Sequence, residues 1–458
     1  RCRVLAAPRG VQEYALVARC GPPPRIWQLS QLPMLGAVLA AVAPYGTMAT
    51  MSIMAALQLL ALGLWLSMSP PQRAREVLAD LRRHPLLWPT LALTAACSAS
   101  LILAATGAVN FYGARPLVQW GPDLAKLWHL FHVFLIAACL RALPEGRFKR
   151  VGQVWLLAGL AAAALGLIQH FVPLYKPMEL PDVGLRGRFH ATGLAGFHLS
   201  FAAIIGFPLA GWAALTAASI KRKGFLRPET LALQGGMVLF AVAAMLTFSK
   251  TMWVALPLTL LATALLGLHG KSRAALAMAV LVISVIWAGS DIAKNRFTGA
   301  RSMNDRLHLW SANQEMIRQY PLLGVGWHHN ADLSHAYYSK LESDYYRSQG
   351  TLLPYDRWKE KSFVSHAHNN LLDQWASTGT LGLLAFLWWN FVVISSAWIV
   401  LKRGDHSKFF MRALGLGLVT GWICLHINGM TQTNFWDAKV MHQIAFVAAF
   451  ALEARRRS

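Results

Sequence analysis

The densest group of side chains capable of chemistry lies in residues 365–382, where a polar run leads into an apolar segment. His366 and His368 are followed directly by Asn369 and, at helical spacing, by Asp373. The unperturbed pKa of histidine is near 6.5, so its imidazole can accept or release a proton at neutral pH. We therefore expect His368 to be catalytic, with the other three side chains in supporting positions.

The same residues allow two other interpretations. A zinc site would need additional ligands at metal-binding spacing, and His366 and His368 alone do not supply them. A proton relay would place ionisable groups inside the apolar segments, whose middles carry almost none. A general base at a membrane surface fits the distribution of polar residues best, and we expect neither a metal nor a cofactor.

Four basic residues could bind an anion beside this base: Arg186, Arg188, Lys250 and Arg306. The planar guanidinium of arginine matches the geometry of a phosphate group. Each residue also has an ordinary interpretation, as a solvated loop cation, a snorkelling lysine or a charge at a helix start. Taken with the histidines, they indicate chemistry on a lipid that carries phosphate, where cations could stabilise a pyrophosphate leaving group.

The composition indicates which kind of structure holds the candidate site residues in position. The chain has 458 residues, of which 55% are hydrophobic and only 14% charged, whereas soluble proteins carry about 25% charged residues. The apolar runs have the length of membrane-spanning helices rather than of barrel strands. We therefore predict an all-α polytopic integral membrane protein with about 12 transmembrane helices, at 28–44, 48–68, 86–107, 122–143, 151–172, 195–218, 229–247, 252–268, 272–289, 379–400, 410–428 and 438–453.

The predicted helices divide the chain into four parts. Residues 1–27 are interpreted as a leader that is disordered or foreign to the protein, and residues 28–289 as transmembrane helices one to nine. Residues 290–378 form a large, partly helical external loop that carries the catalytic motif. Residues 379–458 supply the last three helices and a basic tail.

The placement of charge predicts the orientation. Most of the 43 Lys and Arg residues lie in the N-terminal leader, in alternate connections and in the C-terminal tail, which indicates that these segments face the cytoplasm. The loop at 290–378 then lies on the external face. The formal net charge of +23 is explained by this topology and by contact with membrane lipids, so no nucleic acid partner is expected.

Several sequence blocks resemble the bacterial O-antigen ligases, within the O-antigen ligase/polymerase superfamily. The ligase pattern is His, then Asn, Ser or Gln, then nine residues, Gly, two residues and a small residue. His368-Asn369, Gly379 and Gly382 match it fully. Further blocks resemble superfamily motifs at 306–310, 321–327 and 246–250, the last with Lys250 where arginine is usual, which keeps the charge but loses bidentate binding.

This resemblance implies a glycosyltransferase of the bacterial inner membrane that acts at the periplasmic face without a metal. Such ligases transfer a glycan from undecaprenyl pyrophosphate to a sugar hydroxyl of the lipid A–core oligosaccharide. By analogy His368 would activate that hydroxyl, with inversion at the anomeric carbon. The cations that would hold the pyrophosphate are Arg186, Arg188, Lys250 and Arg306.

The motifs leave the acceptor open. An O-antigen polymerase would use another lipid-linked repeat as acceptor, and a protein O-glycosyltransferase would use an exported protein. A transporter of the lipid-linked glycan, which would carry out no chemistry, is the alternative from another class. The catalytic motifs outside the spans and the lack of convincing carboxylates within them argue against transport.

Overall fold

The computed structural model describes residues 31–180, 187–298, 301–348, 366–403 and 409–458. Secondary structure in these ranges is helical apart from two isolated β-bridges, Phe111–Ala114 and Glu179–Phe189. Ten of the described helices are long and apolar enough to cross a membrane. The predicted class, an all-α polytopic membrane protein, is confirmed. The proposed leader at 1–27 lies outside the described residues.

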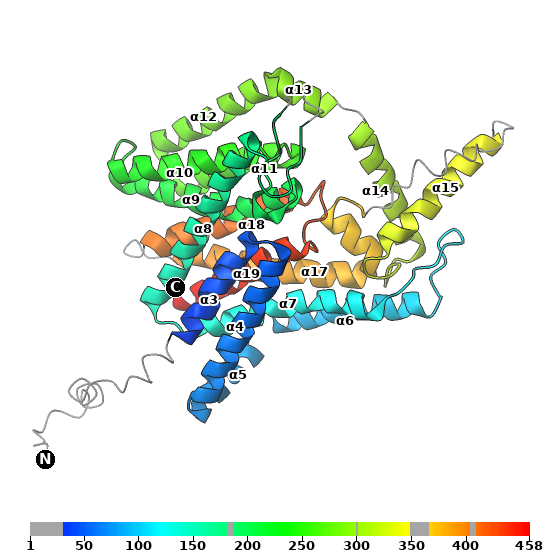
Figure 1. Cartoon of the computed structure of the whole chain (residues 1–458), viewed down its shortest axis with the longest axis horizontal. Helices are drawn as coiled ribbons and strands as arrows, with labels where there is room; N and C mark the ends of the chain where they lie inside the picture. Colours follow the sequence, from blue (N-terminus) through cyan, green and yellow to red (C-terminus); the bar gives the residue numbers. More distant parts are fainter. Residues whose placement is uncertain (1–30, 181–186, 299–300, 349–365, 404–408) are drawn as a thin grey trace, which may run out of the picture.

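The helices follow one another as shown in Figure 1. The N-terminal half contains α3 (Leu32–Val42), η1 (Ala43–Tyr45), α4 (Met48–Met68), α5 (Pro71–Arg82), α6 (Leu87–Ala105), α7 (Trp120–Arg141), α8 (Glu145–Phe171), η3 (Gly193–Ala195) and α9 (His198–Lys223). The C-terminal half contains α10 (Pro228–Met245), α11 (Lys250–Gly267), α12 (Gly270–Gly289), α13 (Asp291–Thr298), α14 (Arg301–Gln319), α15 (Asn330–Ser348), α17 (Asn370–Arg403), α18 (Phe409–Asn428) and α19 (Ala438–Arg457).

Ten spans, rather than the predicted twelve, meet the length and hydropathy requirement within the described residues. The first predicted span is the shorter apolar helix Leu32–Tyr45. The twelfth is α19, which has 20 residues but includes polar residues such as His442, Gln443 and Glu453. These side chains are tolerated because α19 lies inside the bundle, with every residue from Val440 to Ala454 buried.

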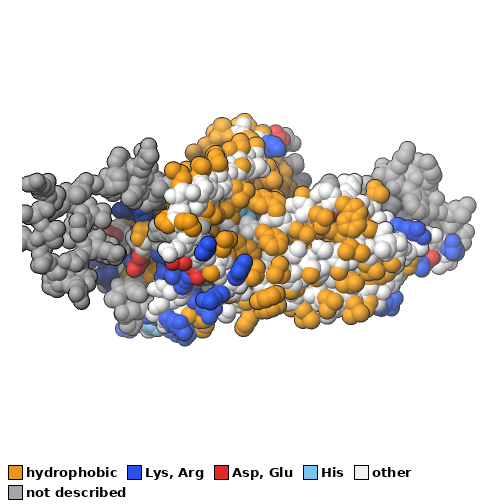
Figure 2. Space-filling model, turned by 90° about the horizontal axis from the view of Figure 1, so that it is seen from below, with side chains coloured by type: hydrophobic (Ala, Val, Ile, Leu, Met, Phe, Trp, Pro, Cys, Tyr) orange, Lys and Arg blue, Asp and Glu red, His pale blue; other side chains and the backbone are white. Residues whose placement is uncertain are grey.

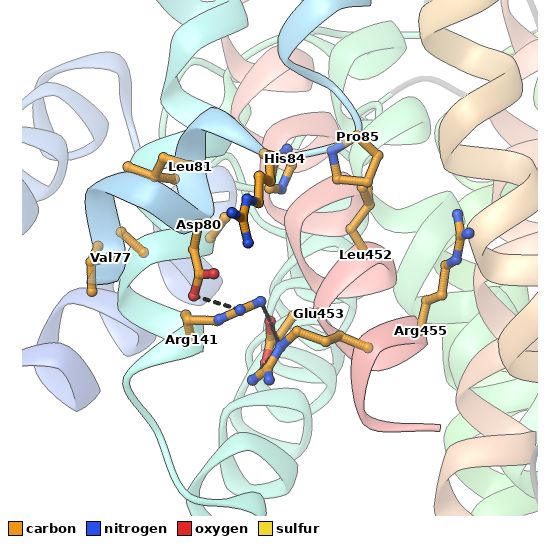
Figure 3. A pocket seen from close by; sticks show the side chains of 13 residues that line it. Val77, Asp80, Leu81, His84, Pro85, Arg141, Leu452, Glu453 and Arg455 are labelled. Carbon is orange, nitrogen blue, oxygen red and sulfur yellow. Dashed lines mark hydrogen bonds and ion pairs between the residues drawn. The ribbon is translucent and has the colours of Figure 1, made fainter. Parts of the chain in front are cut away.

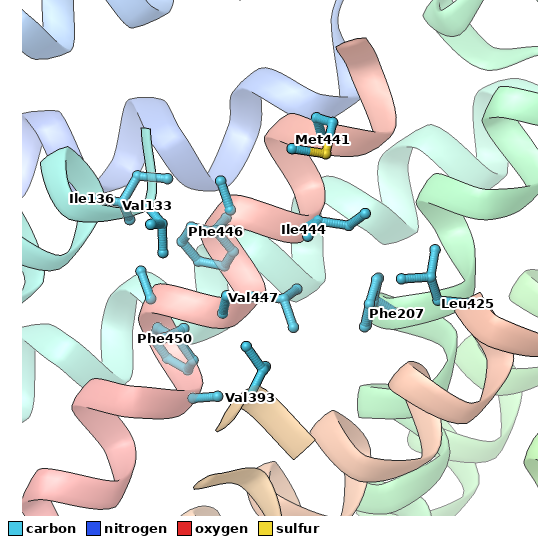
Figure 4. Close-up of a cluster of buried hydrophobic side chains, with 14 of the residues drawn as sticks. Val133, Ile136, Phe207, Val393, Leu425, Met441, Ile444, Phe446, Val447 and Phe450 are labelled. Atoms are coloured by element: carbon cyan, nitrogen blue, oxygen red, sulfur yellow. The ribbon is translucent and has the colours of Figure 1, made fainter. Parts of the chain in front are cut away.

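The core is built around α19. Figure 4 shows Phe446 of this helix beside Val133 of α7, with Val393 of α17 and Phe207 of α9 in the same apolar cluster. The ring of Phe450 stacks on that of Phe148 of α8, with 4.4 Å between centroids. Helices from both halves of the chain therefore meet around the last helix.

The outer surface is apolar where lipid would cover it. On α12, Ile283, Val285 and Ile286 are each at least 66% exposed, which is unfavourable in water but expected against acyl chains. Figure 2 shows apolar side chains over most of one face, with Lys and Arg gathered toward its ends. This distribution matches a bundle that crosses a bilayer.

Among its described residues, the region 290–378 contains three complete helices, α13, α14 and α15, and the start of α17. Its helical character agrees with the partly helical loop expected from the sequence, and α14 ends at Gln319, just before Pro321. In Figure 1, α14 and α15 lie beyond the end of the bundle at which α17 begins. The division of the chain into four parts stays a prediction.

Candidate functional site

The two histidines flank a residue that is held from two directions. Ala367 is fully buried; its N–H donates to Asp373 Oδ1 (3.2 Å) and its carbonyl accepts a hydrogen bond from Trp310 Nε1 (2.9 Å). Trp310 belongs to α14, so the loop is fixed between two helices. His366 remains exposed and His368 half-buried, with their ring centroids 5.3 Å apart.

Asp373 connects the histidine loop to α14 and α15. Its side chain is almost completely buried, and Oδ1 also accepts a hydrogen bond from Asn330 Nδ2 at 2.8 Å. The Asn330 amide donates in addition to Asn313 Oδ1 at 2.9 Å. A buried carboxylate is stable when it is hydrogen-bonded in this way, and this one holds Ala367 in place from α17.

Asn369 begins α17. Its Oδ1 accepts hydrogen bonds from the backbone N–H groups of Leu371 (3.0 Å) and Leu372 (3.1 Å), as an N-cap residue does. Its Nδ2 donates to the Met430 carbonyl at 3.0 Å. The second residue of the His-Asn motif therefore sets both the start of the helix and its attachment to the segment after α18.

His368 has an unusual backbone and an unusual charge environment. Its φ of +48° lies in the left-handed region, which non-glycine residues rarely adopt and which is often found at functional sites. Burial, which has the largest effect, and the charges of His366 and Arg306 together lower the pKa of His368 to about 4. The Gln432 amide acts in the opposite direction. The imidazole is therefore neutral at neutral pH.

Arg306 and Lys250 approach this site from different elements. The charge of Arg306, on α14, acts directly on His368. Lys250 is the first residue of α11, which is capped by the Ser249 hydroxyl accepting from Met252 N–H. The next residue, Thr251, forms a hydrogen bond with Thr431, the neighbour of Gln432. A cation at a helix N-terminus is a favourable environment for phosphate.

Of the two arginines in the 173–194 connection, Arg186 lies outside the described residues. The guanidinium of Arg188 stacks on the Phe171 ring at 4.7 Å. Downstream, His190 Nδ1 contacts the Thr247 carbonyl at 2.8 Å and Ala191 N–H donates to the Leu246 carbonyl at 2.9 Å. The 173–194 connection is therefore hydrogen-bonded to the turn before Lys250. The Arg188 side chain itself packs on the Phe171 ring.

Two motif glycines explain why distant sequence blocks belong together. Gly324 and Gly379 have φ of +68° and +66°, and a Cβ on Gly379 would lie 2.2 Å from backbone atoms of Leu322. Thr380 N–H donates to the Pro321 carbonyl at 2.8 Å. The block at 321–327 therefore packs directly against the end of the His-Asn motif.

Sequence reasoning missed the connection at 429–437, between α18 and α19. Asn370 N–H donates to the Gly429 carbonyl (2.8 Å), and Asn370 Oδ1 accepts from the N–H groups of Asn434 and Phe435. Gln432 contacts His368. The sequence feature that could have indicated this connection is a polar run, Thr431 to Asn434, between two apolar segments.

His328 was also missed. It directly follows the Gly-Val-Gly-Trp sequence and has φ of +66°. Burial, together with the charges of Lys126 and His366, lowers its pKa well below the usual value. Its Nε2 is buried and makes no hydrogen bond to a described residue, which is uncommon. His328 is therefore a second neutral imidazole beside the histidine loop.

These observations define a multi-pass membrane protein whose candidate active site is a neutral histidine, with an arginine nearby, at the end of the helical bundle. A family model described as O-antigen ligase matches residues 235–387. The match covers α11 to α15 and the His-Asn motif, so the resemblance to the O-antigen ligase superfamily is confirmed over this segment. It supports a ligase- or polymerase-type function in O-antigen processing. Comparison with curated proteins gives no match.

Among the described residues, no group of three or more His, Cys, Asp or Glu side chains is placed to hold a metal ion. The assignments of His368, Arg188, Lys250 and Arg306 to catalysis and donor binding remain proposals.

Proposed function

We propose that this protein is an O-antigen ligase that transfers a glycan from undecaprenyl pyrophosphate to a sugar hydroxyl of lipid A–core, at the periplasmic face of the inner membrane. The observation that carries the proposal is the neutral His368 under the influence of Arg306, within a segment that matches the O-antigen ligase family. A neutral imidazole can accept a proton, and a nearby cation can bind the anionic donor.

In the proposed reaction, the acceptor hydroxyl gives its proton to His368 as its oxygen attacks the anomeric carbon of the donor. The bond between that carbon and the pyrophosphate oxygen breaks, and undecaprenyl pyrophosphate leaves with the bonding electrons. Attack from the opposite face inverts the anomeric configuration. Arg306 and Lys250 stabilise the charge that develops on the leaving pyrophosphate.

The low pKa of His368 has a consequence for this reaction. In the ligand-free protein it keeps the imidazole neutral but makes it a weak base, below the optimum for catalysis near neutral pH. The negative charge of a bound pyrophosphate would offset the charge of Arg306. We therefore expect donor binding to raise the pKa of His368 and to strengthen the base only when the donor is in place.

The test is transfer by the purified protein in detergent with EDTA present. Undecaprenyl-pyrophosphate glycan would be offered with lipid A–core, with a pilin, or alone. Glycan on lipid A–core that disappears in His368→Ala, in a variant that still folds, is the expected result. Lengthening of the donor alone would identify a polymerase, and label on the pilin would identify a protein glycosyltransferase.

Full turnover by His368→Ala would remove that residue from the mechanism. Absence of product in all three reactions, with folded protein, would favour transport of the lipid-linked glycan instead.

A further inference from the structure

A cavity of about 380 Å³ lies at the other end of the bundle from the candidate site. Helices α7 and α19 begin on the side of the histidine loop and end here, at Arg141 and Arg457. The short helix α5 and the turn after it complete the wall (Figure 3). Every residue that lines this cavity is described, and none belongs to the proposed donor or acceptor site.

The cavity is positively charged. Four arginines line it, Arg83, Arg141, Arg455 and Arg456, against two acids, Asp80 and Glu453. Burial lowers the pKa of His84, which also lines the cavity, to about 4, so that imidazole adds no charge at neutral pH. The lining therefore carries more positive than negative charge.

Two of the arginines neutralise the two acids. Arg141 lies 2.5 Å from Asp80 and 3.8 Å from Glu453, and Arg456 lies 2.6 Å from Glu453. Arg455 donates to the Ser396 hydroxyl at 3.3 Å, and Arg83 forms no ion pair with a described residue. Arg83 and Arg455 thus leave two positive charges that no described acid balances.

The rest of the lining is apolar, and exposed apolar residues lie close to it in the sequence. Val77 and Leu81 of α5 line the cavity together with Leu452 of α19. Close by in the sequence, Leu78 is 54% exposed and Trp88 is 67% exposed. A helix with arginines on one side and apolar residues on the other is typical of the membrane interface, where tryptophan is also enriched.

We propose that this cavity binds the headgroup of an anionic phospholipid, with the phosphate held by Arg83 and Arg455 and the acyl chains along the apolar wall. Basic pockets between helices at the cytoplasmic end of a membrane protein are suited to such headgroups. A soluble phosphate would bind the arginines but make no contact with the apolar wall. A zwitterionic lipid would pack against the apolar wall but be attracted less by the excess positive charge.

A second basic cavity, of about 270 Å³, lies at the same end and is lined by Lys221, Arg222 and Arg412. Its lining residues Leu401 and Phe409 stand on either side, in the sequence, of residues 404–408, which lie outside the described residues. The proposal therefore concerns the first cavity alone.

The experiment is native mass spectrometry of the full chain in detergent. Phosphatidylglycerol and phosphatidylethanolamine with identical acyl chains would be added separately. The test variant is Arg83→Gln/Arg455→Gln. Its matched control is Arg82→Gln/Arg227→Gln, which removes two exposed arginines at the same end that do not line the cavity.

Wild type should retain phosphatidylglycerol in preference to phosphatidylethanolamine. The test variant should lose affinity for phosphatidylglycerol on the order of fivefold for each charge removed, and the control variant should lose much less. If the double variant does not fold, Arg83→Gln alone, at an exposed position, should change affinity in the same direction.

Three results would overturn the proposal. One is equal retention of the two lipids, and another is an equal loss of affinity in the test and control variants. The third is complete displacement of phosphatidylglycerol by an equal concentration of inorganic phosphate, which would identify a site for a free anion.

Discussion

At the scale of single residues, the imidazole of His368 is surrounded by groups that disfavour its protonated form. Burial has the largest effect, and the charges of His366 and Arg306 add to it. The neutral form required of a base then dominates at all pH values above the lowered pKa, which is about 4. Protonation becomes significant only in clearly acidic solution.

This environment predicts the pH dependence of transfer. In the free protein, kcat/KM should stay level from neutral pH downward and fall with a midpoint near 4, the pKa of His368. In Arg306→Gln one cause of the lowered pKa is removed, so the midpoint should move upward. For wild type with saturating donor, the midpoint in kcat should also lie higher, because the pyrophosphate opposes the positive charge.

The matched control for this profile is Arg318→Gln. Arg318 lies on the same helix, α14, and its partner is Glu315 rather than the histidine loop. Its substitution should leave the acidic midpoint unchanged. An Arg306→Gln profile that coincides with wild type would separate Arg306 from the base.

Lys250 provides a second test at this scale. Lys250→Arg should be tolerated, because arginine keeps the charge and occupies this position in the superfamily motif. Lys250→Ala should weaken use of the donor, lowering kcat/KM by about 10- to 100-fold, as expected for loss of a hydrogen bond to a charged group. The measurement is the rate of transfer as the donor concentration is varied. A donor dependence identical to wild type in the alanine variant would rule out the pyrophosphate role.

At the scale of secondary-structure elements, α17 is broken at Gly379, next to Thr380, whose N–H donates to the Pro321 carbonyl. Gly379 has φ of +66° and ψ of −171°, a conformation almost limited to glycine. A Cβ there would also collide with the backbone of Leu322. Gly379→Ala should therefore destabilise the protein by at least about 2 kcal/mol and reduce transfer, measured as a lowered Tm and as activity.

Gly63→Ala is the matched control for this substitution. Gly63 lies inside α4, and a Cβ at this position meets no atom within 4 Å. Alanine is also the better helix former, so the control should be at least as stable as wild type. Equal stability of Gly379→Ala and Gly63→Ala would show that the break is not required.

The hydropathy of the sequence predicted where the helices lie better than it predicted where their polar ends begin. The predicted span at 379–400 begins at the break, yet α17 begins at Asn370, because Asn369 caps a polar first turn that packs against Asn330 through Asp373. A hydropathy window cannot detect such a turn. The site residues that carry charge and belong to motifs could be predicted from the sequence. The role of Gln432 could not, because it contacts His368, more than 60 residues away in the sequence.

At the scale of the whole molecule, the polar groups divide between the two ends of the bundle. The histidine loop lies at one end, and at the other lie the basic connections that contain Arg141, Lys223 and the tail from Arg455. The positive-inside rule predicts that the basic end faces the cytoplasm. The proposed donor and acceptor would then reach the histidine loop from the periplasm.

Two leucines at opposite ends of the bundle allow this orientation to be measured with matched substitutions. Leu117 is 76% exposed in the connection before α7, and Leu226 is 84% exposed in the connection before α10. Cys97, Cys139 and Cys424 are buried and should react slowly, while the remaining two cysteines would be replaced by serine. In intact inner membranes exposed only on their periplasmic side, an impermeant thiol reagent should label Leu117→Cys and not Leu226→Cys. After lysis it should label both, because only the bilayer protects the second position. Labelling of Leu226→Cys alone before lysis would invert the orientation and place His368 in the cytoplasm, away from the proposed acceptor.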